Sequence, residues 1–385
     1  MEIDALFLGA GASTPFDIPT MKDMAIQFEK TLNSGDEKKL YETICNKLQN
    51  YSYFDLESLI TVLQNITDPA PVVNDILNDP SIHFYFNYGG ESWGKTKNNI
   101  TTLAKANRSI ADSLLLKLKE YLIEACTIDP KEEDFKLYNR LFTVILKHKV
   151  SNFEEQLEEN ARQGTQIKIE LQIFTTNYDF ILETYCMSRE IACENGEIGR
   201  DVCIRRDNNG RLFDGSGVFK IRKLHGSINW YRNQRGKLRC SERPVKLGEK
   251  SLYGDEIVEE VLLYPVRGLY AYREPFYDLF ADMKQNLERL NNWLAIGYSF
   301  RDKDIAGLFI DASGKNRNLN LCLVGLNSDT VKAVAQDRLD GFKGKLVGST
   351  AKFNHDDIDG LLSFLQNPMN SDVVAKSLRR MTGGG

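Results

Sequence analysis

Short apolar runs, each ending abruptly in small or polar residues, constrain the fold of this chain more than any other feature. The residues that end these runs are Gly9 to Ser13, Thr176 to Asp179, His225 to Ser227, Gly297 to Ser299, and Asn327. Buried parallel strands of an α/β sheet carry their ligand contacts at their carboxyl ends. The pattern therefore predicts a Rossmann-like, doubly wound parallel sheet in which these five segments converge on one crevice.

The first run, Ile3 to Leu8, leads into Gly9-Ala10-Gly11-Ala12-Ser13. A strand, a small-residue turn and a helix in this order can direct backbone N–H groups, and the N-terminus of the helix, at a bound phosphate. A tight strand-to-helix turn without a ligand would use the same residues. An ordinary dehydrogenase is disfavoured, because Thr14 replaces the third glycine of G-x-G-x-x-G and a helical pattern follows.

A second segment, Phe219 to Trp230, predicts a strand that carries His225 to the Gly226-Ser227 step. Glycine allows a ligand to approach the backbone closely, so this imidazole is a candidate for catalysis. The chain has only four histidines, of which His83 and His148 are interpreted as packing or surface residues. A lone histidine is usually structural, so that interpretation of His225 stays open.

Apolar residues follow helical spacing over much of the stretch between residues 20 and 164. One such set is Leu56, Leu59, Ile60, Leu63 and Ile66. Ser151-x-x-Glu154 predicts a further helix that ends at Gly164, and residues 68–94 read as a loop. We therefore expect a helical insertion at residues 31–164 within an α/β core made of residues 1–30 and 165–385.

The rest of the core is predicted from its later segments. Pro275 is placed to begin a helix, and two short runs, Leu294 to Gly297 and Leu321 to Gly325, read as buried strands. Lys345 to Gly348 predicts a last strand, and Asp356 to Leu365 a closing helix.

Composition indicates a soluble, reduced and cytoplasmic protein. The net charge of −5 argues against a protein whose main task is to coat nucleic acid. No apolar run reaches the roughly 18 residues that span a bilayer, and the acidic N-terminus is unlike a secretory signal. The seven cysteines are odd in number and form no C-x-x-C pair, so we expect no zinc ribbon and no metal.

Taken together, five motifs resemble those of sirtuins, in particular the sirtuin-like NAD+ hydrolases of bacterial anti-phage defence. The motifs are GAGAS (residues 9–13), TTNYD (175–179), LHGS (224–227), GYSFRDKD (297–304) and VGLN (324–327). They resemble the sirtuin GAGxS loop, the TQNxD motif, the catalytic histidine motif and two later strands that line the dinucleotide. Their order and spacing agree with the family over residues 3–30 and roughly 165–365.

The resemblance implies that NAD+ is the substrate and that its bond to nicotinamide is broken. Asn177 would position the nucleophile, Asp179 would help to hold the nicotinamide end, and His225 would be the general base. The residues implied to contact the remaining dinucleotide are Gly9, Ala10, Gly11, Ala12, Ser13, Thr176, Gly297, Ser299 and Asn327. Turn chemistry at Asn177 and Asp179, and strand-end capping at Ser299 and Asn327, are the structural alternatives.

Two departures from the deacylating sirtuins affect the expected substrate. Those enzymes continue their loop with GIPDFR, whereas this chain reads Asp17-Ile18-Pro19-Thr20-Met21-Lys22. The four-cysteine zinc module that helps to shape the acyl-lysine cleft is also missing from the sequence. Both departures favour water, or a small nucleophile, as the acceptor of the ADP-ribosyl group.

The resemblance thus implies an NAD+ glycohydrolase that acts as the NAD-depleting effector of an anti-phage system by abortive infection. The core and its insertion use nearly all 385 residues, so we expect regulation in trans. Self-assembly into a homo-oligomer, or a partner such as a HerA-type DNA-translocating ATPase, would supply it. We expect no membrane association and no sequence-specific nucleic-acid binding. A protein deacylase or ADP-ribosyltransferase, and a non-catalytic subunit that binds NAD+ or ADP-ribose, are the alternatives.

Overall fold

The structure is a computed structural model, and the part of the chain that it describes has several gaps. The described residues are 2–49, 55–67, 108–146, 171–189, 191–194, 218–241, 243–251, 254–263, 274–325 and 327–367. The predicted helix at Ser151, the predicted loop at residues 68–94, and the histidines His83 and His148 lie outside them.

The chain divides into two compact units. The first comprises Met1–Ile18, Ile128–Leu262 and Ala271–Gly385, and the second comprises Pro19–Thr127 and Leu263–Tyr270. In neither unit does a described helix have the length and apolar character needed to cross a membrane.

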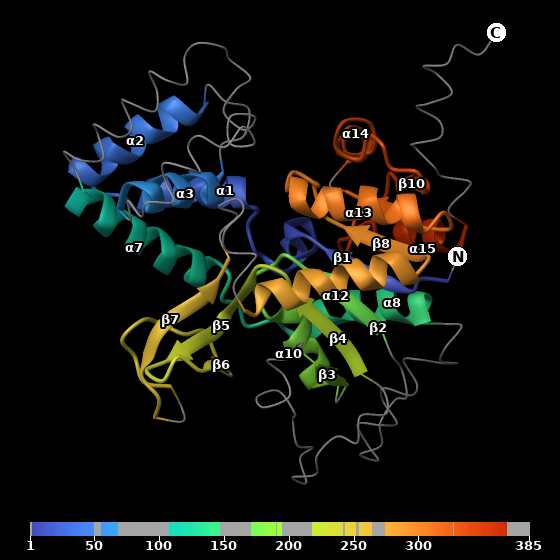
Figure 1. The fold of residues 1–385 in the computed structure, drawn as a ribbon, viewed down its shortest axis with the longest axis horizontal. Coiled ribbons are helices and arrows are strands. Elements are labelled where there is room, and N and C mark those ends of the chain that lie inside the picture. Colours follow the sequence, from blue (N-terminus) through green and yellow to red (C-terminus); the bar gives the residue numbers. More distant parts are fainter. Residues whose placement is uncertain are drawn as a thin grey trace. The chain divides into compact units, whose positions relative to one another are not determined.

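A seven-stranded parallel sheet forms the centre of the first unit, in the order β10-β9-β8-β1-β2-β4-β3 (Figure 1). Its strands are β1 (Ala5–Leu8), β2 (Leu171–Thr175), β3 (Ala192–Glu194), β4 (Val218–Lys223), β8 (Asn292–Ile296), β9 (Asn320–Val324) and β10 (Lys345–Ser349). Strands β2, β3 and β4 lie on one side of β1, and β8, β9 and β10 lie on its other side. The order in which strands are added to the sheet therefore reverses between β1 and β8. This topology confirms the predicted doubly wound α/β class, including the strands predicted at β8, β9 and β10.

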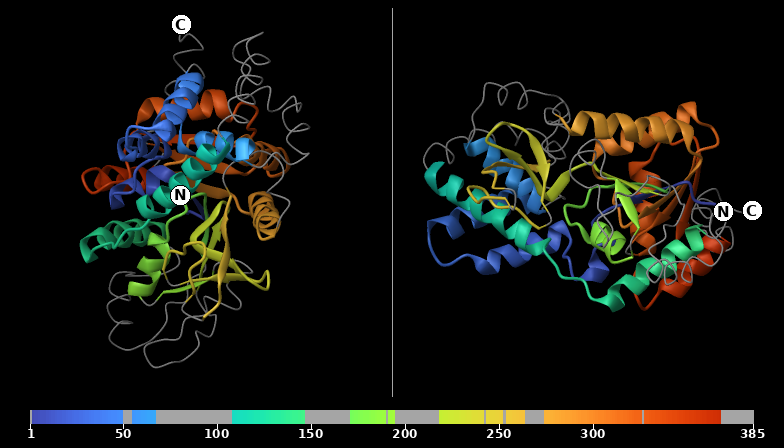
Figure 2. Two further views of the ribbon diagram at one scale, coloured as in Figure 1. Left: turned by 90° about the vertical axis from the view of Figure 1, so that its left-hand side faces the viewer. Right: turned by 90° about the horizontal axis from the view of Figure 1, so that it is seen from below.

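Helices cover both faces of this sheet, which is why β1, β8 and β9 are mostly apolar and do not alternate. Figure 2 shows the strands between α12 (Phe276–Arg289) on one face and α8 (Glu132–Leu146) on the other. The other α-helices in the described part of the unit are α10 (Ile181–Ser188), α13 (Lys303–Lys315), α14 (Ser328–Ala333) and α15 (Ile358–Gln366). The helix predicted after Pro275 is confirmed by α12, whose N-cap is Pro275.

Helix α8 lies with the sheet, although the expected insertion at residues 31–164 included it. Its aromatic side chains explain this placement. The Tyr138 ring stacks on Phe16 at a centroid distance of 5.0 Å, and the Phe142 ring lies 4.9 Å from Phe219 of β4. Burying these rings against the core is strongly favourable, so the helix belongs to the first unit.

The second unit is helical in its described part, as the periodicity predicts. Its helices are α1 (Met21–Thr31), α2 (Asp36–Gln49), α3 (Leu56–Thr67) and α7 (Arg108–Ala125). The apolar stripe of α3 is buried, with Leu56, Leu59, Ile60 and Leu63 inaccessible to solvent. The Tyr41 hydroxyl of α2 donates to the Ala25 carbonyl of α1 at 2.7 Å, which satisfies its buried phenol.

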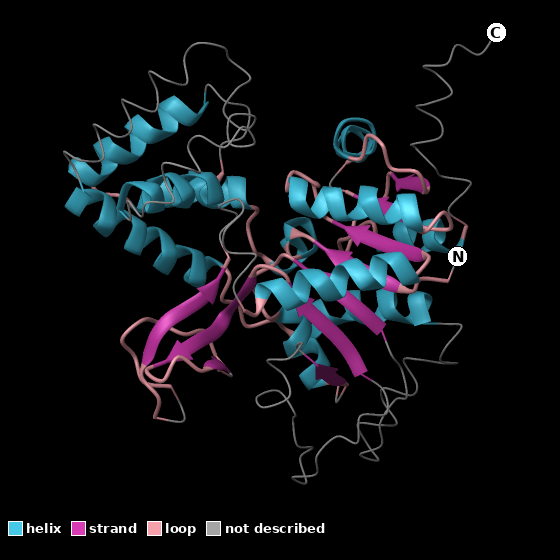
Figure 3. Cartoon of the chain, viewed as in Figure 1, coloured by secondary structure: helices cyan, strands magenta, loops and turns pink. Residues whose placement is uncertain are grey.

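The prediction of one strand from Phe219 to Trp230 is wrong. Strand β4 ends at Lys223, the chain turns at Leu224 and His225, and β5 (Gly226–Asn233) enters a separate antiparallel sheet. That sheet also contains β6 (Leu238–Cys240) and β7 (Ile257–Leu262), and Figure 3 shows it as a distinct group of strands. Gly226 makes the turn possible, because its φ is +82° and a Cβ there would lie 2.1 Å from the Val261 oxygen.

Substituting Gly297 tests the junction between the loops after β1 and β8. Its φ is +65°, and a Cβ there would lie 2.3 Å from the backbone nitrogen of Ala12. Gly297→Ala should therefore lower the free energy of unfolding by more than ~1 kcal/mol, measured by chemical denaturation. Gly307→Ala is the matched control: it lies inside α13 with open space around it and should raise that free energy by ~0.5–1 kcal/mol. Equal effects of the two substitutions would contradict the described junction.

Candidate active site

The loop after β1 folds into two short 3-10 turns, Ala10–Ala12 and Thr14–Phe16, before any α-helix begins. The second turn contains Pro15 and ends at Asp17 in the left-handed conformation, so a continuous α-helix cannot form there. The first described α-helix after the loop begins only at Met21. The helix expected from about residue 20 is thus present as α1, and its role toward a phosphate stays a prediction.

Most backbone N–H groups of this loop are already used within the fold. Gly9 donates to Ile296 at 2.9 Å and Gly11 to Gly297 at 2.9 Å, which ties the loop to β8. Ala12 and Ser13 donate to carbonyls inside the loop, at 2.8 Å and 3.1 Å. Of the five residues, only Ala10 contributes no N–H to these bonds, so the backbone offers an anion one donor here rather than several.

Three predicted site residues form a continuous hydrogen-bond chain. The Asn177 Nδ2 donates to Ser13 Oγ at 2.8 Å and to the Gly9 carbonyl at 3.0 Å. Ser13 Oγ in turn donates to Asp179 Oδ2 at 2.7 Å. Both hydrogens of the Asn177 amide are thus engaged, which fixes its orientation and leaves Oδ1 as its remaining polar atom. The loops after β1 and β2 are joined by side chains of the GAGAS and TTNYD motifs.

The Asp179 carboxylate is buried but well supported. Its Oδ1 accepts the Ile181 N–H at 3.2 Å, at the start of α10. Thr176 is also buried, and its N–H donates to the Leu8 carbonyl at 3.2 Å. The turn bonds expected if these residues were purely structural are therefore present. They occur together with the hydrogen bonds that link Asn177, Ser13 and Asp179.

His225 lies on a turn that is bonded to the TTNYD loop. Leu224 donates its N–H to the Thr175 carbonyl at 2.8 Å, and the Ser227 hydroxyl donates to the Tyr178 carbonyl at 3.2 Å. His225 is buried, and the centroid of its ring lies 6.3 Å from that of Tyr178. Its Nε2 is 3.5 Å from Asp302 Oδ2. The turn thus holds a buried imidazole next to the segment that carries Asn177 and Asp179.

A buried ion pair beneath this segment was not predicted from the sequence. Lys223 Nζ donates to the Asp179 carbonyl and lies 3.2 Å from Glu183 Oε1, and both side chains are nearly inaccessible. Burial raises the pKa of Glu183, and the charge of Lys223 offsets part of that rise. The lysine at the end of β4 was the only sequence signal for this pair.

The remaining predicted residues follow β8 and β9, and in the described part of the chain their side chains are not bonded to the residues discussed above. Gly297 packs against the β1 loop, and the Ser299 carbonyl accepts a bond from Arg338 Nη1 at 3.4 Å. Asn327 is exposed and caps α14, since its Oδ1 accepts the Thr330 N–H at 2.8 Å. Within the described residues, no hydrogen bond joins Ser299 or Asn327 to Asn177, Asp179 or His225. Their contacts with the dinucleotide stay a prediction. In this structure the Asn327 side chain acts as a helix cap, which is the structural alternative for this residue.

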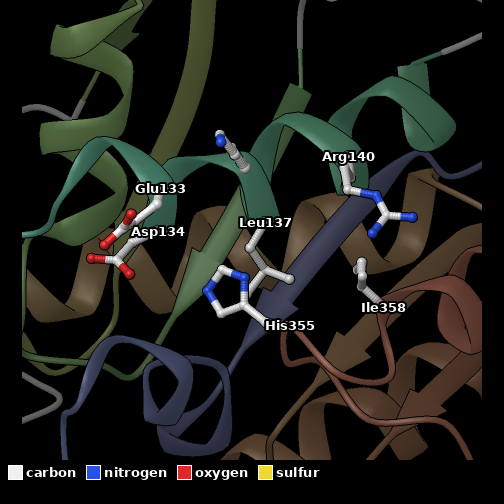
Figure 4. Close-up of a pocket in the computed structure, with 7 residues that line it drawn as sticks. Glu133, Asp134, Leu137, Arg140, His355 and Ile358 are labelled. Carbon is white, nitrogen blue, oxygen red and sulfur yellow. The ribbon is translucent and has the colours of Figure 1, made fainter.

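A hollow of about 460 Å³ lies elsewhere in the first unit, between α8 and the start of α15 (Figure 4). It is lined by Glu133, Asp134, Lys136, Leu137, Arg140, His355 and Ile358. None of these is a predicted site residue, and Arg140 is paired with Asp359. In the described part of the chain, no cluster of three or more His, Cys, Asp or Glu side chains could hold a metal ion.

Breaking the buried pair beneath the site should destabilise the protein in a pH-dependent way. Lys223→Met leaves the Glu183 carboxylate buried without its cation and should cost about 3–5 kcal/mol at neutral pH. The pKa of Glu183 should rise further in this variant, so the loss should shrink in mildly acidic solution, where the carboxyl is protonated. Urea unfolding at the two pH values measures both effects.

The double variant Lys223→Met/Glu183→Leu is the control. It removes the unpaired charge and should recover most of the stability at neutral pH, although the bond to the Asp179 carbonyl is still lost. A single variant that is equally destabilised at both pH values, with no recovery in the double variant, would show that the pair is not what stabilises this segment.

Comparison with known proteins finds a family model that matches the region carrying most of the site. Residues 171–339 match the family described as "SIR2-like domain". No curated protein matches the chain.

A solved Sir2 homologue mutant in complex with ADP-ribose is 12% identical, with 95% of this chain and 92% of that chain covered and a TM-score of 0.41. A Sir2 complex with the inhibitor EX-527, 2'-O-acetyl-ADP-ribose and a deacetylated p53 peptide is 13% identical, with 95% and 94% covered and a TM-score of 0.36. Over residues 171–339, which contain Asn177, Asp179 and His225, the chain is thus similar to the SIR2-like domain family.

Proposed function

We propose that this protein is an NAD+ glycohydrolase that cleaves the bond between nicotinamide and ribose. The observation that carries the proposal is the buried imidazole of His225, neither of whose nitrogens has a hydrogen-bond partner among the described residues. Buried polar groups without partners are rare, and at a ligand site they are explained by a group that the ligand brings. The similarity to the SIR2-like domain family supports NAD+ as that ligand.

In the proposed reaction, nicotinamide leaves with the electron pair of the glycosidic bond, and positive charge develops on the ribose. The fixed Asn177 amide holds the attacking water, and His225 accepts a proton from it. The products are nicotinamide, ADP-ribose and one proton. Asp179, held by Ser13, lies on the same loop and would contact the nicotinamide end.

The other half of the dinucleotide is proposed to lie along the loops after β1, β8 and β9. The residues assigned to it are Gly9, Ala10, Gly11, Ala12, Ser13, Thr176, Gly297, Ser299 and Asn327. The reversal of strand order between β1 and β8 supports this assignment, because open α/β sheets bind ligands at such a point. With four loop amides already engaged, Ala10 would be the backbone donor to the diphosphate.

We further infer that the enzyme acts in the cytoplasm as the effector of an anti-phage system. Unrestrained hydrolysis of NAD+ would harm the cell that makes it, so its activity requires control. Control in trans, through self-assembly or a HerA-type DNA-translocating ATPase, is the proposal that the sirtuin-like resemblance supports.

Turnover of NAD+ by wild type and by site variants tests the proposed function. His225→Ala and Asn177→Ala should each lower nicotinamide release by about 10²–10⁴-fold, measured by chromatography of the reaction mixture. His355→Ala is the matched control, because His355 is exposed in the hollow beside α8, and it should keep full activity. Full activity of His225→Ala would exclude this residue as the base. Nicotinamide release that requires an added acyl-peptide would favour a deacylase instead.

The same assay addresses control when it is run across protein concentrations, with and without the candidate ATPase. Specific activity should rise with protein concentration or on addition of the partner. Full activity of the isolated protein at every concentration, together with no binding to the ATPase, would exclude regulation in trans.

A further inference from the structure

The imidazole of His225 has one charged neighbour among the described contacts, the carboxylate of Asp302. The separation between Nε2 and Oδ2 is 3.5 Å, slightly longer than a hydrogen bond and well within ion-pair distance. The His225 side chain is 5% exposed and that of Asp302 is 20% exposed, so water screens the pair only partly. A second titratable group near the imidazole is the phenol of Tyr178, whose ring centroid lies 6.3 Å from that of His225.

The backbone of α13 fixes the other oxygen of Asp302. Oδ1 accepts the N–H groups of Asp304 at 2.9 Å and Ile305 at 3.3 Å, so Asp302 is the N-cap of the helix. Because these bonds use Oδ1, Oδ2 stays directed at the imidazole. The cap itself does not need a charge, since asparagine serves equally well at this position. Capping alone therefore leaves the negative charge beside His225 unexplained.

The carboxylate is held in its ionised form. Burial would raise the pKa of Asp302, but the nearby His225 and the two helix amides outweigh burial, so the pKa is lowered. An ionised carboxylate can only accept hydrogen bonds. The ring nitrogen that faces it must then carry the hydrogen, which leaves the other nitrogen free to accept a proton.

We propose that Asp302 is a positioning residue for His225: it orients the imidazole, keeps the hydrogen on Nε2, and stabilises the cation formed when Nδ1 accepts a proton. The catalytic part of this inference rests on the proposed function. In the reaction, one hydrogen of the attacking water moves to Nδ1 and its oxygen bonds to the ribose carbon. Asp302 itself stays unprotonated, as the carboxylate does in the serine-hydrolase triad.

The test is Asp302→Asn, which keeps the cap but removes the charge. Its Tm should lie within about 2 °C of wild type, because asparagine caps the helix as well as aspartate. The kcat for NAD+ should fall about 10²-fold or more while KM changes little, since the imidazole acts on the transition state rather than on substrate binding. Asp304→Asn is the matched control: it removes one exposed negative charge from the same helix end and should leave kcat unchanged.

A spectroscopic readout separates this inference from the proposed function. The chain has four histidines, so the imidazole ¹⁵N signals can be assigned to His225 by comparison with His225→Gln. Neutral wild-type protein should show the hydrogen on Nε2, and Asp302→Asn should lose that preference. An unchanged His225 spectrum, or a changed spectrum with kcat within about twofold of wild type, overturns the proposal. If wild type hydrolyses no NAD+, the proposed function fails, and the spectrum alone decides whether Asp302 fixes the tautomer.

Discussion

The parallel pairing of β1 with both β2 and β8 is the constraint on which the site depends. Leu8 is in register with Thr175 on one side and with Ile296 on the other, so the three strands end at the same level. The loops that follow must then meet at one edge. Because β1 lies at the point where strand order reverses, this edge is where a doubly wound sheet can accept a ligand. Every bond between the GAGAS loop and its neighbours follows from that register.

The buried carboxylates at this edge have partners within the fold, whereas the imidazole of His225 has no hydrogen bond within the described part of the chain. Asp179 receives bonds from Ser13 and Ile181, Glu183 is paired with Lys223, and one oxygen of Asp302 receives two helix amides. His225 is the buried polar side chain among them whose nitrogens both lack a hydrogen bond. The imidazole is therefore the group at this edge that a ligand could engage, which is why the proposed reaction is placed on it.

The sequence permits prediction of those parts of the fold that depend on local pattern. Strands β1, β2, β8, β9 and β10 each contain a short, mostly apolar run because both faces of the sheet are covered, and such runs can be recognised without the structure. Once those strand ends converge, the hydrogen bonds that link Asn177, Ser13 and Asp179 can form.

Other parts of the site depend on contacts between distant segments, so no local pattern reports them. The turn at His225 exists because β5 leaves the parallel sheet to pair with β7, far along the chain. The pairing of Lys223 with Glu183, and of His225 with Asp302, likewise depends on which strand ends become neighbours. Asp302 lies within the quoted GYSFRDKD motif, but its position beside the imidazole is set by the start of α13.

Whether water is the group that cleaves NAD+ at this site is decided by running the reaction in ¹⁸O-labelled water. Mass spectrometry of the ADP-ribose product then reports the origin of the new hydroxyl. We predict nicotinamide release together with ADP-ribose that carries one ¹⁸O atom on the ribose carbon that held nicotinamide. Intact NAD+ in the presence of folded, activated protein, or nicotinamide release with transfer of the ADP-ribosyl group to another acceptor, would contradict it.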